Sequence, residues 1–265
     1  MAPYRRTGST ARPDVLVCAG LDPSGGAGLI ADVRVLTELG ARPVGVVTAL
    51  TIQNTTGVIG ATACDPEVVG HQLTFLMTDV EVRAVKIGMI GSIEIAKAIA
   101  NALHLTSAPV VWDPIAAPSR GDVTYIPAFD DAVYALRPHL TLVTPNAREL
   151  ALLAAMPVTD LASAEVAGRA LAARLDASVL VKGGHLGGDE SIDVLLHSGG
   201  REELRGPRIS GGEHVHGTGC ALASAIAANL AAGKDLVVAC HLAKEYVAAL
   251  IADPAGPGRG AKAVL

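Results

Sequence analysis

Aromatic side chains are scarce in this sequence, because Phe, Trp and Tyr make up 3% of its 265 residues while hydrophobic residues make up 50%. Alanine and valine must therefore fill the core, which suits close packing of helices on a sheet. Cysteine is also rare: Cys18, Cys64, Cys220 and Cys240 stand far apart and form no CxxC or Cys/His ligand spacing. This pattern argues against a disulfide framework or a zinc site, and we expect reduced thiols, as in the cytoplasm.

The sequence also lacks a basic block, and its formal net charge is −5 at pH 7. A nucleic-acid partner therefore has no electrostatic support, and a phosphorylated substrate would need cations placed locally. No apolar run approaches the ~18 residues of a membrane span. We expect a cytoplasmic protein with neither a nucleic-acid nor a membrane partner.

Continuous apolar runs alternate with segments of helical periodicity along most of the chain. The runs predicted to be strands are residues 15–18, 44–48, 84–87, 110–112, 141–143 and 179–181. The segments predicted to be helices between them are residues 28–39, 66–79, 93–103, 147–155 and 162–175. Strands that are apolar throughout, each followed by a helix, indicate an α/β protein with a parallel sheet covered on both faces.

The pattern changes in the last third of the chain. Residues 193–197 and 202–207 flank a Ser-Gly-Gly turn and predict an antiparallel hairpin, and Ala-rich helices are predicted at 221–232 and 235–252. We find no internal repeat and no linker. The domain assignment is therefore a loose arm at 1–13, one domain at 14–253 and a loose Pro/Gly-rich tail at 254–265.

A glycine-rich segment, AGLDPSGGAG at residues 19–28, leaves the first predicted strand and enters a helix. Glycines let the backbone approach a ligand closely, and a helix N-terminus offers free N–H groups. The spacing matches neither GxGxxG nor a P-loop, so a tight turn explains it equally well. Asp22 favours a binding role, because a carboxylate in this crevice can hold a polar ligand.

The segment HGTGC at residues 216–220 directly precedes an Ala-rich helix. Two glycines at a helix start aim several N–H donors at one point, a geometry that suits a phosphoryl group in transfer. In the first helical turn the thiolate of Cys220 should be favoured, so Cys220 could accept a proton from a substrate hydroxyl. The alternative is that Cys220 is only a small residue at a crowded helix start.

Polar residues stand at the ends of three later strands. Asp113 ends a buried strand, Asn146 and Glu149 follow the next one, and Lys182 begins a KGGH turn. The carboxyl ends of strands in an open α/β sheet face the ligand crevice, and a lysine there could meet phosphate. The simpler alternatives are a helix cap for Asn146 and a solvated turn for Lys182.

Together these segments resemble the hydroxymethylpyrimidine/phosphomethylpyrimidine kinase family of the ribokinase-like superfamily. The match runs from about residue 15 to residue 248. It rests on AGLDPSGGAG at 19–28, TAL at 48–50, QNT at 53–55, GV at 57–58, KIGM at 86–89, DP at 113–114, TPN at 144–146 with Glu149, KGGH at 182–185 and HGTGC at 216–220. Each motif is modest, but their common order is specific.

The resemblance implies a three-layer α/β/α fold with a central, mostly parallel sheet, and a homodimer. It implies ATP as donor with Mg²⁺, and two phosphorylations in thiamin biosynthesis, first of 4-amino-5-hydroxymethyl-2-methylpyrimidine and then of its monophosphate. Its pyrimidine contacts would be Gly20, Asp22, Ala27, Gln53, Met89 and Ile115. Its base would be Cys220, with Gly217 and Gly219 as the anion hole. Its nucleotide side would hold Asp113, Asn146, Glu149, Lys182 and Thr218, with Asp113 and Glu149 reaching the metal through water.

The sequence departs from the family pattern in three places. After Asp113-Pro114 it reads IAAPSRG at residues 115–121, before His216 it has His-Val rather than Asn-Thr, and no His- and Gly-containing end follows Pro254. We expect the 115–121 segment to overhang the crevice as a lid, with a roomier acceptor pocket and Arg120 meeting the monophosphate.

Three other functions fit parts of this pattern. A pyridoxal or pyridoxine kinase shares the fold and the Cys-type glycine-rich segment. A cysteine hydrolase would use Cys220 with His216, although a spacing of four residues across a glycine turn is not a dependable geometry for a base. A non-catalytic vitamin-binding relative would keep the pocket without ATP turnover.

Overall fold

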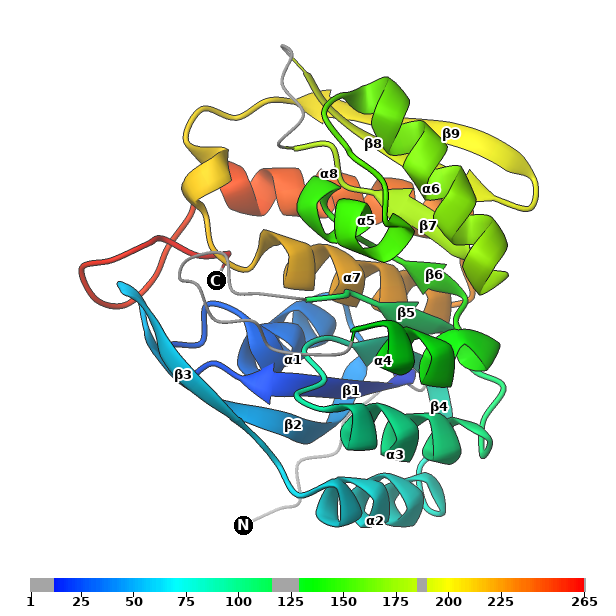
Figure 1. The fold of residues 1–265 in the computed structure, drawn as a ribbon. Helices are drawn as coiled ribbons and strands as arrows, with labels where there is room; N and C mark the ends of the chain where they lie inside the picture. Colours follow the sequence, from blue (N-terminus) through cyan, green and yellow to red (C-terminus); the bar gives the residue numbers. More distant parts are fainter. Residues whose placement is uncertain (1–11, 116–128, 185–189, 265) are drawn as a thin grey trace.

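A mostly parallel sheet organises the protein (Figure 1). The computed structural model describes residues 12–115, 129–184 and 190–264. Within them the sheet has nine strands in the order β3-β2-β1-β4-β5-β6-β7-β8-β9. The strands are β1 (Asp14–Leu21), β2 (Arg42–Asn54), β3 (Gly57–Ala63), β4 (Val82–Ile87), β5 (Val110–Trp112), β6 (Leu142–Val143), β7 (Ser178–Val181), β8 (Glu190–His197) and β9 (Gly200–Pro207). Pairing is parallel from β2 to β7, and β3, β8 and β9 are antiparallel to their neighbours.

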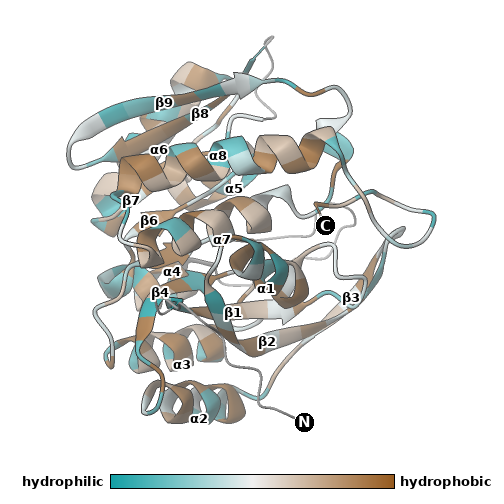
Figure 2. Ribbon diagram, turned by 180° about the vertical axis from the view of Figure 1, so that it is seen from behind, coloured by the Kyte–Doolittle hydropathy of each residue, from teal (hydrophilic) through white to brown (hydrophobic). Residues whose placement is uncertain are grey.

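Helices cover both faces of this sheet. One face carries α1 (Gly28–Glu38), α7 (Thr218–Ala231) and α8 (Leu236–Ala252), which lie in front of the sheet in Figure 2. The other face carries α2 (Pro66–Met77), α3 (Ile93–Leu103), α4 (Phe129–Leu136), α5 (Ala147–Ala154) and α6 (Leu161–Leu175), seen in front in Figure 1. The three-layer α/β/α fold predicted from the resemblance is confirmed.

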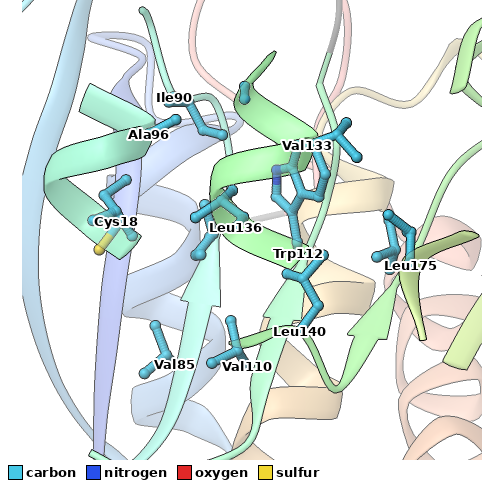
Figure 3. Packing of buried hydrophobic residues seen from close by; sticks show 14 of the residues in the cluster. Cys18, Val85, Ile90, Ala96, Val110, Trp112, Val133, Leu136, Leu140 and Leu175 are labelled. Carbon is cyan, nitrogen blue, oxygen red and sulfur yellow. The ribbon is translucent and has the colours of Figure 1, made fainter. Parts of the chain in front are cut away.

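The alternation of side chains along β1 shows why both faces are buried. Leu16 and Cys18 belong to the core cluster under α2–α6, whereas Val15 and Val17 belong to the cluster under α1, α7 and α8. Figure 3 shows the first cluster around the fully buried Trp112. A strand whose two faces are both buried must be apolar at every position, which is the pattern that the sequence shows.

Two elements and the tail differ from the prediction. The edge strand β3 and the helix α4 were not predicted, and β2 extends to Asn54. The prediction of a loose tail is wrong for the part that the structure describes. Ala263 and Val264 are buried, at 3% and 2% exposure, and residues 255 and 263 pair as an antiparallel bridge. Its glycines allow close backbone approach rather than disorder. Most of the N-terminal arm, residues 116–121 with Arg120, and His185 lie outside the described residues.

Candidate active site

One cavity of about 1160 Å³ lies at the carboxyl ends of the parallel strands. This is the edge where open α/β sheets bind their ligands. Apart from Arg120, which lies outside the described residues, the residues assigned to the site from the sequence all line it: Gly20, Asp22, Ala27, Gln53, Met89, Asp113, Ile115, Asn146, Glu149, Lys182, Gly217, Thr218, Gly219 and Cys220. The structure therefore brings together motifs that are spread over about two hundred positions of the sequence.

Two glycine-rich segments interlock at the centre of this cavity. Gly217, the N-cap of α7, has a φ of +84°, and a Cβ there would lie 2.0 Å from the carbonyl oxygen of Gly26. Gly28 has a φ of +60°, and its Cβ would lie 2.3 Å from the carbonyl oxygen of Gly20. Only glycine fits at either position. The first N–H groups of α7 have no acceptor within the helix, so they are available to an anion.

Cys220 lies in the first turn of α7 and is 5% exposed. The expectation that its thiolate is favoured is wrong for the ligand-free protein, because burial raises the pKa of Cys220 to about 12. The positive charge of Lys86 and a hydrogen bond from the Gly28 backbone act in the opposite direction and are outweighed. Cys220 is therefore a thiol at neutral pH, and it must lose its proton before it can act as a base.

One lysine and two carboxylates form a buried cluster beside the start of α7. Lys182 Nζ lies 2.7 Å from Asp113 Oδ1 and 3.7 Å from Glu149 Oε2. Burial, together with the nearby Asp113 carboxylate, raises the pKa of Glu149 to about 7. A Cβ on Gly219 would lie 3.0 Å from Lys182 Nζ, so the helix start lies directly against this ammonium group. The cluster holds more negative than positive groups next to the anion-binding backbone.

Asn146 and Glu149 also begin α5. The Asn146 side chain accepts a hydrogen bond from the Glu149 N–H, at 2.9 Å, and the Glu149 carboxylate accepts one from the Asn146 N–H, at 2.8 Å. This is a capping box, which satisfies two N–H groups that the helix leaves free. The helix-cap role considered for Asn146 is confirmed. Because the cap fixes Glu149, it also orients the carboxylate that faces Lys182.

At the other end of the cavity, Asp22, Gln53 and His216 meet. Asp22 accepts hydrogen bonds from the backbone and hydroxyl of Ser24, at 2.8 and 2.7 Å, and from the Ala27 N–H, at 3.1 Å. His216 Nε2 lies 3.3 Å from Asp22 Oδ2 and 3.1 Å from Gln53 Nε2. Although burial opposes ionisation, the hydrogen bonds from His216 and Ser24 lower the pKa of Asp22.

A role for His216 in a kinase site was not predicted from the sequence. Its contacts join residues 163 and 194 positions away, so no local pattern reveals them, although its place next to Gly217 was a signal. Among the described residues, the partners of His216 Nε2 are Gln53 and Asp22. A cysteine hydrolase would need that imidazole as a base for Cys220, so this alternative loses its support.

Beyond the charged cluster, the cavity has an apolar part that was also not predicted. It is lined by side chains of α7, α8 and the segments before them: Ile209, Val215, Leu222, Val247, Ala248 and Ile251. Lys244 and Asp193 border it as an ion pair at 2.8 Å, and Asp193 also accepts the Gly183 N–H at 2.8 Å. An apolar slot with a polar border suits a flat heterocycle that carries polar substituents.

The donors near Lys182 suit a hard cation. Carboxylate oxygens such as those of Asp113 and Glu149 are the ligands that Mg²⁺ prefers. Within the part of the chain that the structure describes, no group of three or more His, Cys, Asp or Glu side chains could hold a metal ion. A magnesium ion here would thus take most of its ligands from phosphate and water, as is usual for this ion.

Over the residues that the structure describes, no helix is long and apolar enough to cross a membrane.

The fold and the cavity define the class of ribokinase-like small-molecule kinases. The structure of the pyridoxal kinase from Staphylococcus aureus in complex with ADP has a TM-score of 0.87 and 28% identity, covering 96% of this chain and 93% of that chain. The phosphomethylpyrimidine kinase from Clostridium difficile 630 has a TM-score of 0.77 and 30% identity, covering 91% of this chain and 100% of that chain.

Within this class, the chain belongs to the phosphomethylpyrimidine kinase family, whose pattern matches residues 22–265. The hydroxymethylpyrimidine/phosphomethylpyrimidine kinase of Streptomyces coelicolor is 40% identical to it over 251 residues, which are 94% of this chain and 93% of that protein. The resemblance inferred from the ordered motifs is confirmed, and the protein is a phosphotransferase.

Proposed function

We propose that the protein transfers the terminal phosphoryl group of ATP to the hydroxymethyl group of 4-amino-5-hydroxymethyl-2-methylpyrimidine, and then phosphorylates the resulting monophosphate, in thiamin biosynthesis or salvage. The observation that carries the proposal is the cavity at the carboxyl ends of the parallel strands. Its Asp22–Gln53–His216 end suits a polar heterocycle, its centre offers backbone N–H groups to an anion, and its far end is apolar. Family membership supports the same reaction.

Gln53 would recognise the aminopyrimidine. His216 Nε2 can donate to Asp22 or accept from Gln53, but a single ring nitrogen cannot do both at once. A ligand that gives Gln53 a better partner resolves this competition, and an amide matches a ring nitrogen beside an amino group. Gly20 lets Met89 pack close to the first glycine-rich loop, since a Cβ there would lie 3.0 Å from Met89 Sδ, and Met89 and Ile115 would contact the ring.

The phosphoryl group would then lie over the start of α7. The N–H groups at Gly217–Cys220 would stabilise its charge, and Lys182 would leave Asp113 or Glu149 to meet phosphate oxygens. Cys220 would first have to lose its thiol proton to solvent; as a thiolate it would then take the hydroxyl proton as the oxygen–phosphorus bond forms and the bond to the leaving ADP breaks. Mg²⁺, when bound with ATP, neutralises phosphate charge, and Asp113 and Glu149 would hold it through water. Asn146 and Thr218 would contribute to the nucleotide side.

A homodimer and a cytoplasmic location stay predictions. The roles of individual site residues are likewise part of this proposal, and the contacts described above support them.

An acceptor panel tests the proposed function. The protein is incubated with ATP and Mg²⁺ and with the pyrimidine alcohol, its monophosphate, pyridoxal or pyridoxine, and the products are identified by phosphorus NMR. We expect the pyrimidine alcohol to have the highest kcat/KM and the monophosphate to be accepted. Preference for pyridoxal would overturn the substrate assignment. Binding without ADP formation would indicate the non-catalytic relative, and a monophosphate that is never used would restrict the protein to one step.

A further inference from the structure

The segment at residues 255–264, here termed the C-terminal strap, leaves α8 and reaches the tip of the β2–β3 hairpin (Figure 1). The Ala261 N–H donates to the Thr55 carbonyl oxygen at 2.7 Å, and the Gly260 N–H donates to Thr55 Oγ1 at 3.2 Å. A Cβ on Gly260 would lie 1.9 Å from the Thr55 carbonyl oxygen, so this approach is possible only for glycine. The hairpin tip that the strap grips lies two residues from Gln53.

The same strap holds the segment before α7. The His216 N–H donates to the Lys262 carbonyl oxygen at 2.8 Å, and the Val264 N–H donates to the His216 carbonyl oxygen at 3.1 Å. His216 is therefore fixed by both of its backbone groups. Ala263 also contacts the first glycine-rich loop, since a Cβ on Gly26 would lie 3.0 Å from the Ala263 Cβ. Val264 anchors the end of the strap in the core beneath α7, at 2% exposure.

These contacts close a ring. Gln53 meets His216 through side chains at 3.1 Å, and the strap joins the backbones behind the same two residues, Thr55 on one side and His216 on the other. The hairpin turn at residues 54–57, which connects Gln53 to Thr55, is stiff, because Asn54 Oδ1 accepts the Thr56 N–H at 2.8 Å and the Gly57 N–H at 3.3 Å. Displacement of the strap must therefore change the separation of the Gln53 and His216 side chains.

We propose that the C-terminal strap is a positioning element for the acceptor: through Thr55 and His216 it sets the spacing of Gln53 and His216, and so determines affinity for the heterocycle. The inference rests on the proposed function for the identity of that heterocycle. The strap is bonded to the backbone on both sides of the ring, at Thr55 and at His216. In the proposed function ATP would bind near Lys182, at the opposite end of the cavity, and its binding should not be affected.

Gly260→Ala is the sharpest test, because its methyl group must push the strap away from Thr55. We expect KM for the pyrimidine alcohol to rise about tenfold, with KM for ATP within about twofold of wild type. Thr55→Ala removes only the side-chain acceptor for the Gly260 N–H and should raise the KM for the pyrimidine alcohol about threefold. It provides a milder variant if Gly260→Ala folds poorly. Arg259→Ala is the matched control, since its side chain is exposed, and should behave as wild type.

A double-mutant cycle separates positioning from general damage. In the Gln53→Leu background, Gly260→Ala should have little further effect on the KM of the alcohol, because both changes act on one contact. An unchanged tenfold factor in that background, or a KM that Gly260→Ala leaves as in wild type, would overturn the proposal.

Hydrogen exchange gives a readout that needs no substrate. Gly260→Ala should speed the exchange of the backbone amides of Ala261 and His216, while Arg259→Ala should not. An unchanged exchange rate at His216 would also overturn the proposed role of the strap. If wild type fails to phosphorylate the pyrimidine alcohol while hydrogen exchange responds as expected, the proposed function is wrong, but the link from the strap to His216 is retained.

Discussion

Two lysines, one fully and one largely buried, lie on or just after different strands of the same sheet, and their surroundings differ. Lys86 on β4 is fully buried, with its Nζ 2.7 Å from Asp32, and the other carboxylate oxygen of Asp32 accepts the Ser224 hydroxyl at 2.8 Å. Lys182 follows β7, retains 15% side-chain exposure and lies between Asp113 and Glu149. Both lysines line the cavity, but Lys86 has one carboxylate partner and no exposed side-chain surface, whereas Lys182 has two carboxylate partners and keeps some exposure.

This difference separates a structural pair from a functional one. Burial works against the charge on Lys86, and the attraction of Asp32 nevertheless raises its pKa, so the pair has no charge left over for a ligand. The Lys182 cluster carries a carboxylate in excess, which a cation can neutralise, and a lysine that can exchange a carboxylate for phosphate. We infer that charge balance, rather than burial, distinguishes the two lysines.

The largest effect on activity is expected at Cys220, whose thiol interacts electrostatically with both Lys86 and Lys182. Cys220→Ala should lower kcat by roughly 10²–10⁴-fold, because the hydroxyl proton loses its acceptor, while binding of the pyrimidine changes far less. Steady-state kinetics and calorimetric binding measure the two quantities. Cys64→Ala, at a partly exposed cysteine outside the cavity, is the control. Near-normal turnover of Cys220→Ala would remove it as the base.

Lys86→Met should destabilise the protein by about 3–5 kcal/mol, because it leaves the Asp32 carboxylate buried without a counter-charge. Urea denaturation followed by circular dichroism measures this loss. The double variant with Asp32→Leu should recover most of it, since both charges are then gone. A single variant as stable as wild type would mean that water reaches Asp32, and the contrast between the two lysines would fail.

Lys182→Met should affect ATP kinetics more than stability. Its carboxylates border the cavity, where water and cations can solvate them, so we expect a smaller loss of stability than for Lys86→Met. The value of kcat/KM for ATP should fall roughly 10–100-fold, because a phosphate contact is lost. Comparing both variants in both assays is decisive: equal stability losses with unchanged ATP kinetics would show that Lys182 is structural too.

The smallest effect concerns Glu149, whose pKa is raised to about 7 from an unfolded value of 4.5. The folded protein then binds more protons than the unfolded chain between these values, so stability is present at low pH and falls as the pH rises through this window. Glu149→Gln should remove that slope, on the order of 1 kcal/mol per pH unit, in metal-free protein. Urea denaturation at pH 5 and pH 8 checks this, and an unchanged slope would assign it to another group.

The fold could be predicted from the sequence to the extent that burial on both faces makes strands apolar throughout, as in residues 15–19 of β1. The edge strand β3 (Gly57–Ala63) escaped because it is half-buried and rich in small residues, with no such pattern. The tail was misjudged for the opposite reason. Glycine and proline usually mark loose chain, but Gly260 is required by a backbone contact with Thr55 that only the folded structure reveals.

The site residues could be found because their motifs are ordered and stand at strand ends. Their electrostatics could not. A helix start favours a thiolate, yet the burial of Cys220 has the larger effect on its pKa, and burial depends on packing by distant parts of the chain. His216 was missed for a related reason, because its partners come from the first glycine-rich loop and from β2.

The interlock of Gly26 with Gly217 has a consequence for how the protein folds. A Cβ on Gly217 would lie 2.0 Å from the Gly26 carbonyl oxygen, so the anion-binding backbone exists only when segments from opposite ends of the chain have met. Contacts of such long sequence separation form slowly, after local helices and hairpins. Competence to bind phosphate should accordingly be among the last properties acquired during refolding. Nucleotide binding, followed in time, would report completion of the tertiary structure rather than collapse.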